Sequence, residues 1–400
     1  MSSLKPVFLS YRKEAALVKL RHPWLFSDAI LKPEGIADGE LCDVFLSDKQ
    51  TFFGRGYYNS KSKIVVRFLT RNQQHVVDQH FFEDRLRELK AIRERFIYTD
   101  KTNAYRLVFG ESDGLPGLVL DKYDEVYVMQ IHTAGMEMLK PVVVEAIKKV
   151  FDPKTLYERS DVNVRLLEGL KECPSQHLFG EELAGDIVFK ENGIPFYVDV
   201  VHGQKTGFFL DQRENRKSLQ KYVTGKTLLN AFCYTAGFSV YAALAGASRI
   251  TSMDISKHAI EAAKNNFQLN GLDSEKFEFV VADVFRYLSD CIKEKIGFDI
   301  IILDPPAFVK NAKSLDKGMA GYLQINEFAL KMLPVGGILV SSSCSAFVTD
   351  AMFQKMLTLA SHRTRCNLKV LEIRHQPPDH PFNLDFPEGK YLKFWVLEKG

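Results

Sequence analysis

Apolar and polar positions alternate in two different ways along the chain, and the change falls near residue 195. Beyond that point, short apolar runs are separated by amphipathic stretches whose apolar residues recur every three or four positions. The runs predict strands and the stretches predict helices, and five such strand–helix units over about 140 residues are typical of a doubly wound parallel sheet of the α/β class. The predicted strands are 226–231, 249–254, 277–281, 298–303 and 337–342, and the predicted helices are 239–244, 256–270, 284–291, 321–333 and 351–360.

The part of the chain before residue 195 has a mixed pattern. Residues 1–75 contain short strand-like runs and turns, which predict a small β-rich domain; the runs are 41–47, 54–58 (broken and restarted by its glycines) and 64–69. Residues 76–190 mix helical periodicity with strand-like runs and predict a central α+β domain, with helices at 78–96 and 138–150 and strands at 106–108, 118–120, 126–131 and 155–158. The third predicted domain is 191–400.

The composition narrows the class of protein. Of the 400 residues, 46% are hydrophobic and 26% are charged, which excludes a disordered or collagen-like chain. The longest apolar stretch is far below the roughly 20 residues that span a bilayer, and the first 20 residues lack the apolar core of a secretory signal. The six cysteines are scattered with no CxxC pair, which argues against a zinc site and a disulfide framework. We therefore expect a soluble cytoplasmic protein with no membrane association.

Positive charge is concentrated near the N-terminus. Residues 1–75 contain 12 Lys and Arg against 7 Asp and Glu, a net charge of +5, whereas the whole chain carries only +3. A small basic domain on a near-neutral body fits a nucleic-acid-binding module. An ordinary solvated surface explains the same charges equally well.

Three predicted strand ends carry features of a nucleotide-like cofactor site. The first strand runs into Asn230-Ala231-Phe232-Cys233-Tyr234-Thr235-Ala236-Gly237-Phe238, a small-residue turn that lets a ligand approach the backbone. Asp254 ends the second strand at the spacing of a ribose-binding acid, and Asp283 follows the third. Because no GxGxxG cradle for a pyrophosphate is present, this pattern favours S-adenosylmethionine over NAD. A Rossmann-like scaffold with solvated strand-end acids is the alternative.

The fourth strand ends in Asp304-Pro305-Pro306-Ala307-Phe308. The two prolines hold the chain extended, so we expect Asp304 to face the ligand crevice. The sequence is similar to the one that amino-methyltransferases use to hold a planar nitrogenous base, on which Phe308 would stack. A turn that only closes the strand is the alternative.

A thiol follows the fifth strand, in Ser341-Ser342-Ser343-Cys344-Ser345. A thiolate reacts only where it is accessible and its pKa is tuned, and methylation of a pyrimidine at C5 needs such a nucleophile to add at C6. Cys344 is therefore the candidate nucleophile, and Cys233, within the predicted cofactor loop, is the rival thiol. An inert cysteine is the alternative. Upstream, the segment from His202 to Gly207 lacks the spacing of a P-loop, so we exclude triphosphate binding there.

Several blocks in order give the chain a specific resemblance. It resembles the bacterial 23S ribosomal RNA cytosine-C5 methyltransferases of the large-subunit methyltransferase I type over nearly its whole length. The blocks are RHPWLFSDAI (21–30), GESDGLPGLVLDKY (110–123), YERSDVNVR (157–165), HGQKTGFFLDQR (202–213), NAFCYTAGFS, DPPAF, SSSCS and FPEGKYLK (386–393). One departure is Ala236, where the family usually has glycine, and it restricts φ at that position.

The resemblance implies a PUA RNA-binding domain at 1–75, a central α+β domain at 76–190 and a Rossmann-like class I methyltransferase domain at 191–400. It implies S-adenosylmethionine as cofactor, 23S ribosomal RNA as partner, a homodimer as a plausible assembly, and Cys344 as nucleophile. The residues expected at the cofactor are Gln212, Arg213, Asn230, Phe232, Tyr234, Thr235, Gly237, Asp254, Ile255, Asp283 and Val284, and those expected at the base are Asp304, Pro305, Pro306 and Phe308.

The expected reaction is formation of 5-methylcytidine through an adduct of Cys344 at C6, on a base that is unpaired or flipped out. Asp304 would hold the N3/N4 edge of the base, and a further group, for which Asp379, His380 and Glu388 are candidates, would remove the C5 proton. Four alternatives stay open. They are methylation of a uridine by the same chemistry, methylation of an exocyclic nitrogen without Cys344, a non-catalytic RNA-binding assembly factor, and a small-molecule methyltransferase.

Overall fold

The computed structural model describes residues 4–183, 185, 187–273 and 277–400. They form two compact units, and each unit is assembled from separate stretches of the chain. The first unit contains the chain up to Gly193 together with 198–210 and 378–389, and the second contains 194–197, 211–377 and 390–400. The domain boundaries predicted after residues 75 and 190 stay predictions.

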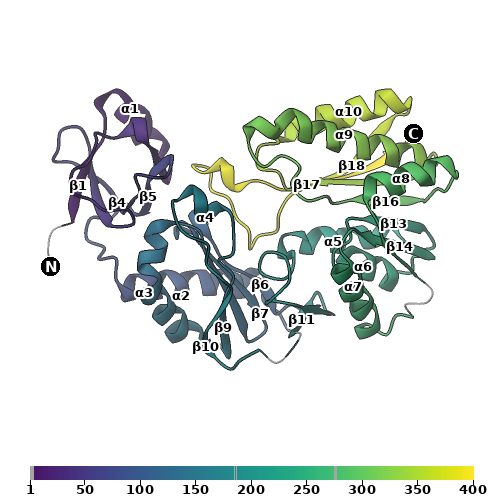
Figure 1. Cartoon of the computed structure of the whole chain (residues 1–400), viewed down its shortest axis with the longest axis horizontal. Helices are drawn as coiled ribbons and strands as arrows, with labels where there is room; N and C mark the ends of the chain where they lie inside the picture. Colours follow the sequence, from purple (N-terminus) through teal and green to yellow (C-terminus); the bar gives the residue numbers. More distant parts are fainter. Residues whose placement is uncertain (1–3, 184, 186, 274–276) are drawn as a thin grey trace. The chain divides into compact units, whose positions relative to one another are not determined.

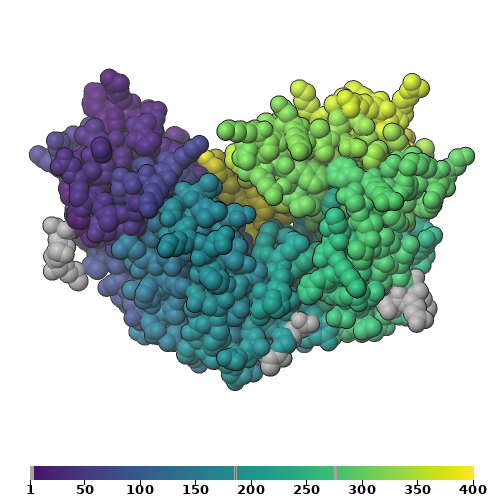
Figure 2. All heavy atoms as spheres, in the orientation of Figure 1, coloured from purple at the N-terminus to yellow at the C-terminus, as the bar shows by residue number. Residues whose placement is uncertain are grey.

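The N-terminal part of the first unit is a five-stranded sheet in the order β1-β3-β4-β5-β2 (Figure 1). Its elements are β1 (Lys5–Phe8), α1 (Tyr11–Leu20), β2 (Trp24–Phe26), β3 (Leu41–Phe45), β4 (Phe52–Tyr58) and β5 (Ile64–Thr70). Their buried side chains, among them Val7, Leu25, Val44 and Val66, form a small core of their own. In the space-filling view the purple atoms of this part are closely packed (Figure 2). The predicted β-rich unit is thus present.

Two details of this sheet differ from the expectation. Helix α1 was not predicted, because none of its residues is buried and no apolar stripe marks it. The predicted break of the strand at its glycines is wrong, since β4 runs without interruption through Gly54 and Gly56. A Cβ atom at Gly56 would lie 2.1 Å from the carbonyl oxygen of Arg67 on β5. Glycine is therefore needed there for the close approach of two strands.

The rest of the first unit is a second five-stranded sheet, in the order β10-β9-β8-β7-β6, with two helices that pack against each other. The elements are α2 (Gln79–Phe96), β6 (Ala104–Phe109), β7 (Leu118–Tyr123), β8 (Val126–Ile131), α3 (Ala134–Phe151), β9 (Thr155–Glu158), α4 (Val164–Leu167) and β10 (Gln176–Gly180). Phe82, Leu86 and Leu89 of α2 face the core of this sheet, which confirms their helical spacing. A two-stranded sheet of β11 (Ile187–Glu191) and β12 (Ile194–Val198) follows.

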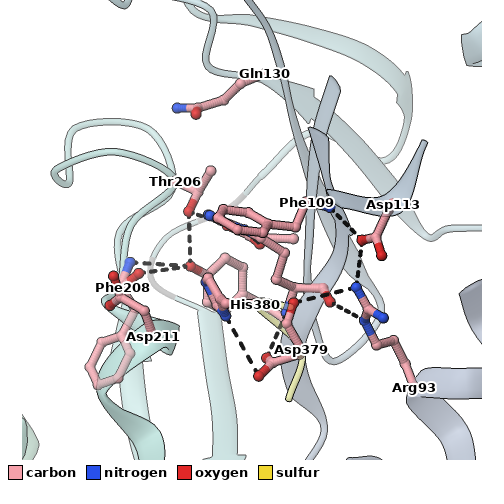
Figure 3. A network of polar contacts seen from close by, with 12 residues as sticks. Arg93, Phe109, Asp113, Gln130, Thr206, Phe208, Asp211, Asp379 and His380 are labelled. Atoms are coloured by element: carbon pink, nitrogen blue, oxygen red, sulfur yellow. Dashed lines mark hydrogen bonds and ion pairs between the residues drawn. The ribbon is translucent and has the colours of Figure 1, made fainter. Parts of the chain in front are cut away.

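A late segment of the chain, 378–389, returns to this first unit through Asp379 (Figure 3). The carboxylate of Asp379 accepts a hydrogen bond from the backbone N–H of Arg106 at 3.1 Å. Arg93 donates to Asp113 at 2.5 Å and to the carbonyl oxygen of Asp379 at 3.4 Å (Figure 3). Asp379 and His380 are fully buried, and Glu388 lies 3.2 Å from His22. All three candidate bases therefore belong to the first unit.

The second unit is built on a seven-stranded sheet in the order β15-β14-β13-β16-β17-β19-β18. The first five strands are parallel, and β19 runs antiparallel between β17 and β18. The five predicted strand–helix units are all present, and the largest difference is at α9, which begins six residues before its predicted start at 321. The elements are α5 (Arg213–Leu219), β13 (Thr227–Ala231), α6 (Gly237–Leu244), β14 (Arg249–Asp254), α7 (Lys257–Leu269), β15 (Glu278–Val281), α8 (Val284–Lys293), β16 (Ile300–Leu303), α9 (Leu315–Met332), β17 (Ile338–Ser343), α10 (Asp350–Thr364), β18 (Leu368–Arg374) and β19 (Lys393–Lys399).

Alternate residues of the central strands enter two different cores. On β16, Ile301 and Leu303 pack with α8, α9 and α10, whereas Ile300 and Ile302 pack with α5 and α6 on the other face. Figure 1 shows these two groups of helices on opposite sides of the sheet. A sheet covered on both faces exposes functional groups only at its edges and strand ends, so the crevice beyond the strand ends is the place to examine.

Membrane-spanning helices and metal-ligand clusters are both absent from the described residues. Among the helices in these ranges, none has both the length and the hydropathy needed to cross a membrane. Within the same ranges, no group of three or more His, Cys, Asp or Glu side chains is placed to hold a metal ion.

Candidate active site

The carboxyl ends of the parallel strands of the second unit meet at one edge of the sheet. Ala231 on β13 lies beside Met253 on β14 and beside Leu303 on β16. Leu303 in turn lies beside Ser341 on β17. The residues that follow these positions therefore leave the sheet at the same edge, next to β13, where the strand order changes direction. The structure brings together the predicted strand-end residues of the cofactor loop and of the Asp304 and Cys344 segments.

The loop after β13 has an unusual backbone. Phe232, Tyr234 and Ala236 have φ angles of 62°, 49° and 60°, so three non-glycine residues within five positions adopt the left-handed conformation. Each costs about 1–2 kcal/mol, and such strain is concentrated at functional sites. The family departure Ala236 thus occupies a position that glycine would adopt without strain. The loop is held by Cys233, whose N–H donates to the carbonyl oxygen of Met253 at 2.8 Å.

The acid at the end of β14 fixes this loop. One carboxylate oxygen of Asp254 accepts from the N–H of Tyr234 at 3.0 Å, and the other accepts from the N–H of Ser256 at 2.9 Å. Each oxygen keeps a lone pair for a further donor such as a ribose hydroxyl. The next side chain, Ile255, is 70% exposed. An acceptor and an exposed apolar surface therefore stand side by side at this strand end.

The other predicted cofactor residues occupy three kinds of position. Asn230 is buried on β13, donates to Ser239 at 2.9 Å, and leaves its Oδ1 without a partner among the described residues. Asp283 is exposed and caps α8 by accepting from the N–H of Arg286 at 3.0 Å, a structural role that leaves one oxygen over. Further predicted cofactor residues are also buried, and they are Thr235, Gly237 and Val284. A buried acceptor, a strand-end carboxylate and an exposed isoleucine fit the ammonium, ribose and adenine of S-adenosylmethionine.

Asp304 lies at the end of β16 and is half-buried. Gln212 donates to it at 2.9 Å, and the same amide reaches the hydroxyl of Ser342 at 3.3 Å. Burial raises the pKa of Asp304 to about 6, and the nearby Asp211 carboxylate acts in the same direction. A carboxyl group with this pKa carries or releases a proton near neutral pH, which an ordinary aspartate does not.

Gln212 and Arg213, which are predicted to lie over the cofactor, both contact other residues of the second unit. Gln212 is tied to Asp304, and its own Oε1 accepts from Asn215 at 2.7 Å. Arg213 is 1% exposed and donates to Glu214 at 3.1 Å. Gln212 thus orients the carboxylate of Asp304, and sequence reasoning missed this contact because the two residues are far apart in the chain.

The residues after Asp304 are held in an aromatic cluster. Pro305 is buried and Pro306 is exposed. The ring of Phe308 packs against Phe232 (6.2 Å between ring centroids), Phe285 (6.0 Å) and Tyr322 (4.7 Å). Phe308 is therefore supported on several sides, which leaves only part of its surface for stacking on a base.

Cys344 follows β17 and is half-buried. The fully buried Tyr322 holds the residues on either side of it, because Ser343 donates to the tyrosine oxygen at 3.0 Å and the hydroxyl of Ser345 lies 2.9 Å from it. By contrast, burial raises the pKa of the rival Cys233 well above its ordinary value, so that thiol stays protonated.

Sequence reasoning missed both Tyr322 and Lys393 around Cys344. The ammonium of Lys393 donates to the carbonyl oxygen of Ser345 at 2.6 Å. Tyr322 lies on an amphipathic helix, where periodicity does not separate it from ordinary core residues. Lys393 ends the block FPEGKYLK, which was the available signal.

Comparison with known proteins agrees with this geometry. The sequence profile of an S-adenosylmethionine-dependent methyltransferase family matches residues 170–393, and that of a PUA-like domain matches residues 11–71. Ribosomal RNA large subunit methyltransferase I of Aeromonas hydrophila is 39% identical over 393 residues, 98% of each chain. The protein of the same name from Shewanella denitrificans is 42% identical over 376 residues, 93% of this chain and 94% of that one.

Solved structures agree as well. The candidate methyltransferase SMU.776, crystallised with SAH, has a TM-score of 0.86 and 27% identity, and 100% of each chain is covered. A candidate SAM-dependent methyltransferase of Streptococcus mutans has a TM-score of 0.85 and 27% identity, covering 99% of this chain and 100% of that one. The predicted fold class and cofactor are thereby confirmed. The chain belongs to the S-adenosylmethionine-dependent methyltransferase family, among the relatives named ribosomal RNA large subunit methyltransferase I.

Proposed function

We propose that the protein methylates C5 of a cytidine in 23S ribosomal RNA, with the Cys344 thiolate as the nucleophile that activates the base. The observation that carries this proposal is the placement of Cys344. It is half-buried just beyond β17, and two residues before it the hydroxyl of Ser342 contacts Asp304. The names of the curated relatives give ribosomal RNA of the large subunit as their substrate, which supports the RNA class.

The chemistry follows from these groups. C5 of cytosine is a weak nucleophile until a thiolate adds to C6. When the bond from Cys344 Sγ to C6 forms, the electrons of the C5–C6 double bond move into the ring, and C5 becomes the nucleophilic carbon of an enamine. Negative charge then develops at N3. Asp304, with its pKa raised to about 6, is suited to donate a proton to that atom and to hold the N3/N4 edge. A base then takes the C5 proton, the C6–Sγ bond breaks to release the Cys344 thiolate, and the N3 proton returns to Asp304, which restores the neutral aromatic ring.

S-adenosylmethionine, when bound, supplies the electrophilic methyl group. The residues that would hold it are those of the strained loop after β13 and its neighbours at the same sheet edge. Asp254 would accept from ribose hydroxyls, Ile255 would cover the purine, and Asn230 would accept from the ammonium group. The remaining predicted cofactor residues, including Gln212 and Arg213, are proposed as part of the surrounding wall.

RNA affinity is assigned to the basic N-terminal sheet, whose residues 11–71 match the PUA-like profile. Lysine and arginine side chains bind phosphates without reading sequence, and the target cytidine must be unpaired or flipped out for C6 to reach a thiolate. The homodimer implied by the family resemblance stays a prediction.

The test is methyl transfer to deproteinised 23S RNA from cells that lack this gene, with the nucleosides identified by mass spectrometry. The wild type is compared with Cys344→Ala and with the control Cys366→Ala, which removes another half-buried thiol, at the end of α10. We expect 5-methylcytidine from the wild type and the control, and a loss of at least a thousandfold in rate from Cys344→Ala.

The other outcomes separate the rivals. Formation of 5-methyluridine would show that the target base is a uridine and would leave Cys344 as the proposed nucleophile. An N-methylated base from both the wild type and Cys344→Ala would move the chemistry to Asp304 and refute the role of the thiol. Absence of product from RNA and from ribosomal subunits, with S-adenosylmethionine still bound, would favour a different substrate.

A further inference from the structure

One buried charge near the candidate nucleophile has no carboxylate partner among the residues that the structure describes. Lys393 begins β19, is 3% exposed, and lies directly opposite Ser343 in the antiparallel pair with β17. Its ammonium donates to the carbonyl oxygens of Ser345 and Tyr391, each at 2.6 Å. A buried ammonium that is bound only to neutral carbonyls is costly, so a counter-charge is expected nearby.

The position of the ammonium points to Cys344 as that counter-charge. Lys393 lies opposite the residue before Cys344 in the strand pair, and its ammonium donates to the carbonyl oxygen of the residue after Cys344. Its side chain therefore lies alongside the backbone of Cys344. An ammonium has three donors, and two are used by Ser345 and Tyr391, which leaves the third for a thiolate.

Three neighbouring groups, Cys344, Asp350 and Lys390, affect the pKa of Lys393 through their charges. Burial lowers the pKa of Lys393 to about 8, a negative charge on Cys344 or Asp350 raises it, and Lys390 lowers it. Asp350, at the start of α10, forms an ion pair with Lys390 at 2.7 Å. With a pKa of about 8, roughly nine in ten Lys393 side chains remain charged at pH 7.

We propose that the Lys393 ammonium is the counter-charge of the Cys344 thiolate, a positioning residue that keeps the sulfur ionised and fixed at the sheet edge. The thiol proton leaves to solvent, and the ion pair replaces it. The proposal rests on Cys344 being the nucleophile for its place in the reaction. The ion pair itself exists without RNA or cofactor, and it is therefore measurable without either.

The experiment follows alkylation of Cys344 by iodoacetamide against pH in the full-length protein, with the labelled peptide identified by mass spectrometry. An opposite charge within about 4–6 Å moves a pKa by 1–3 units. We expect Lys393→Met to move the midpoint of the Cys344 profile upward by at least one pH unit, so that its alkylation at pH 7 is about tenfold slower. Lys393→Arg, which keeps the cation, should stay near the wild type.

The matched control is Lys399→Met. Lys399 ends the same strand, and its ammonium also donates to two carbonyl oxygens, those of Leu330 at 2.7 Å and Leu333 at 2.6 Å. It lies six residues, or about 20 Å, from Lys393 along β19, so its loss should leave the Cys344 profile unchanged. Should circular dichroism show that Lys393→Met is unfolded, Lys393→Gln keeps a donor and removes only the charge.

Methyl transfer gives a second readout. If the ion pair acts as proposed, kcat of Lys393→Met at pH 7 is about tenfold below that of the wild type. The ratio of the two rates at the same pH narrows as the pH is raised towards 9, because the thiol then ionises without help. Coincident alkylation profiles of the wild type, Lys393→Met and Lys399→Met would overturn the inference even if Cys344 proved essential. Conversely, a shifted profile with fully active Cys344→Ala would refute the proposed function and leave the ion pair standing.

Discussion

Replacing Asp304 with asparagine should stabilise the second unit at alkaline pH while it abolishes methyl transfer. Burial raises the pKa of Asp304 from its ordinary 3.8 to about 6, so the native state binds the proton more tightly than the unfolded chain does. Below about pH 4 both states are protonated and no penalty exists. As the pH rises through 6, the native state must accept a buried charge, and the free energy of unfolding falls.

The size of the penalty follows from the two pKa values. The gap between 3.8 and about 6 corresponds to about 3 kcal/mol at pH 8, and to about half of that at pH 5, where the native carboxyl is still mostly protonated. Asparagine carries no charge and keeps an oxygen for Gln212. The stability of the variant relative to the wild type should therefore be higher at pH 8 than at pH 5, by on the order of 1 kcal/mol.

The assay is urea unfolding followed by the fluorescence of Trp395. The chain has two tryptophans, Trp24 and Trp395, and Trp395 is buried in the core of the second unit. A Trp24→Phe background therefore makes the signal specific for that unit. Equal stabilisation at both pH values, or a variant that loses stability at pH 8, would show that the surroundings of Asp304 do not disfavour its charge.

Two further substitutions test the packing. Tyr322→Phe removes the hydroxyl that links Ser343 and Ser345. It should lower the free energy of unfolding by about 2 kcal/mol and slow methyl transfer. The control Tyr11→Phe, at a side chain that is 84% exposed, should change neither quantity. An unchanged urea midpoint for Tyr322→Phe would mean that water replaces the hydroxyl. Gly56→Ala places a Cβ atom 2.1 Å from the carbonyl of Arg67 and should destabilise the N-terminal sheet by about 3 kcal/mol, measured by Trp24 fluorescence on β2. Wild-type stability would contradict the close approach of β4 and β5.

The sequence was most informative where a strand is buried on both faces. The apolar run that became β16 is short and unbroken, so both the strand and the functional residue at its end were predictable. Asp304 and Cys344 were found in this way, because a polar residue directly after a buried strand has a known position.

Contacts between distant segments were not predictable. Gln212 reaches the site from the segment before α5, Tyr322 from α9 and Lys393 from β19. Sequence blocks mark Gln212 and Lys393, but no local pattern shows which distant residues they contact. Helix α1 was missed because it buries none of its residues. Strands β18 and β19 were missed because the strand–helix rhythm stops before them, so a count of repeating units ends one hairpin too early.

The divided course of the chain has a consequence for its synthesis. The first unit needs residues 378–389, and the second needs 390–400, whose strand β19 lies between β17 and β18. A ribosome that has made the first 377 residues has therefore completed neither unit. Both units are completed only by residues 378–400, so a chain that stops before residue 393 lacks β19, the inner strand between β17 and β18. Lys393 follows Cys344 by 49 residues, so a truncated chain that carries Cys344 without Lys393 has a thiol but not the ammonium of the proposed pair.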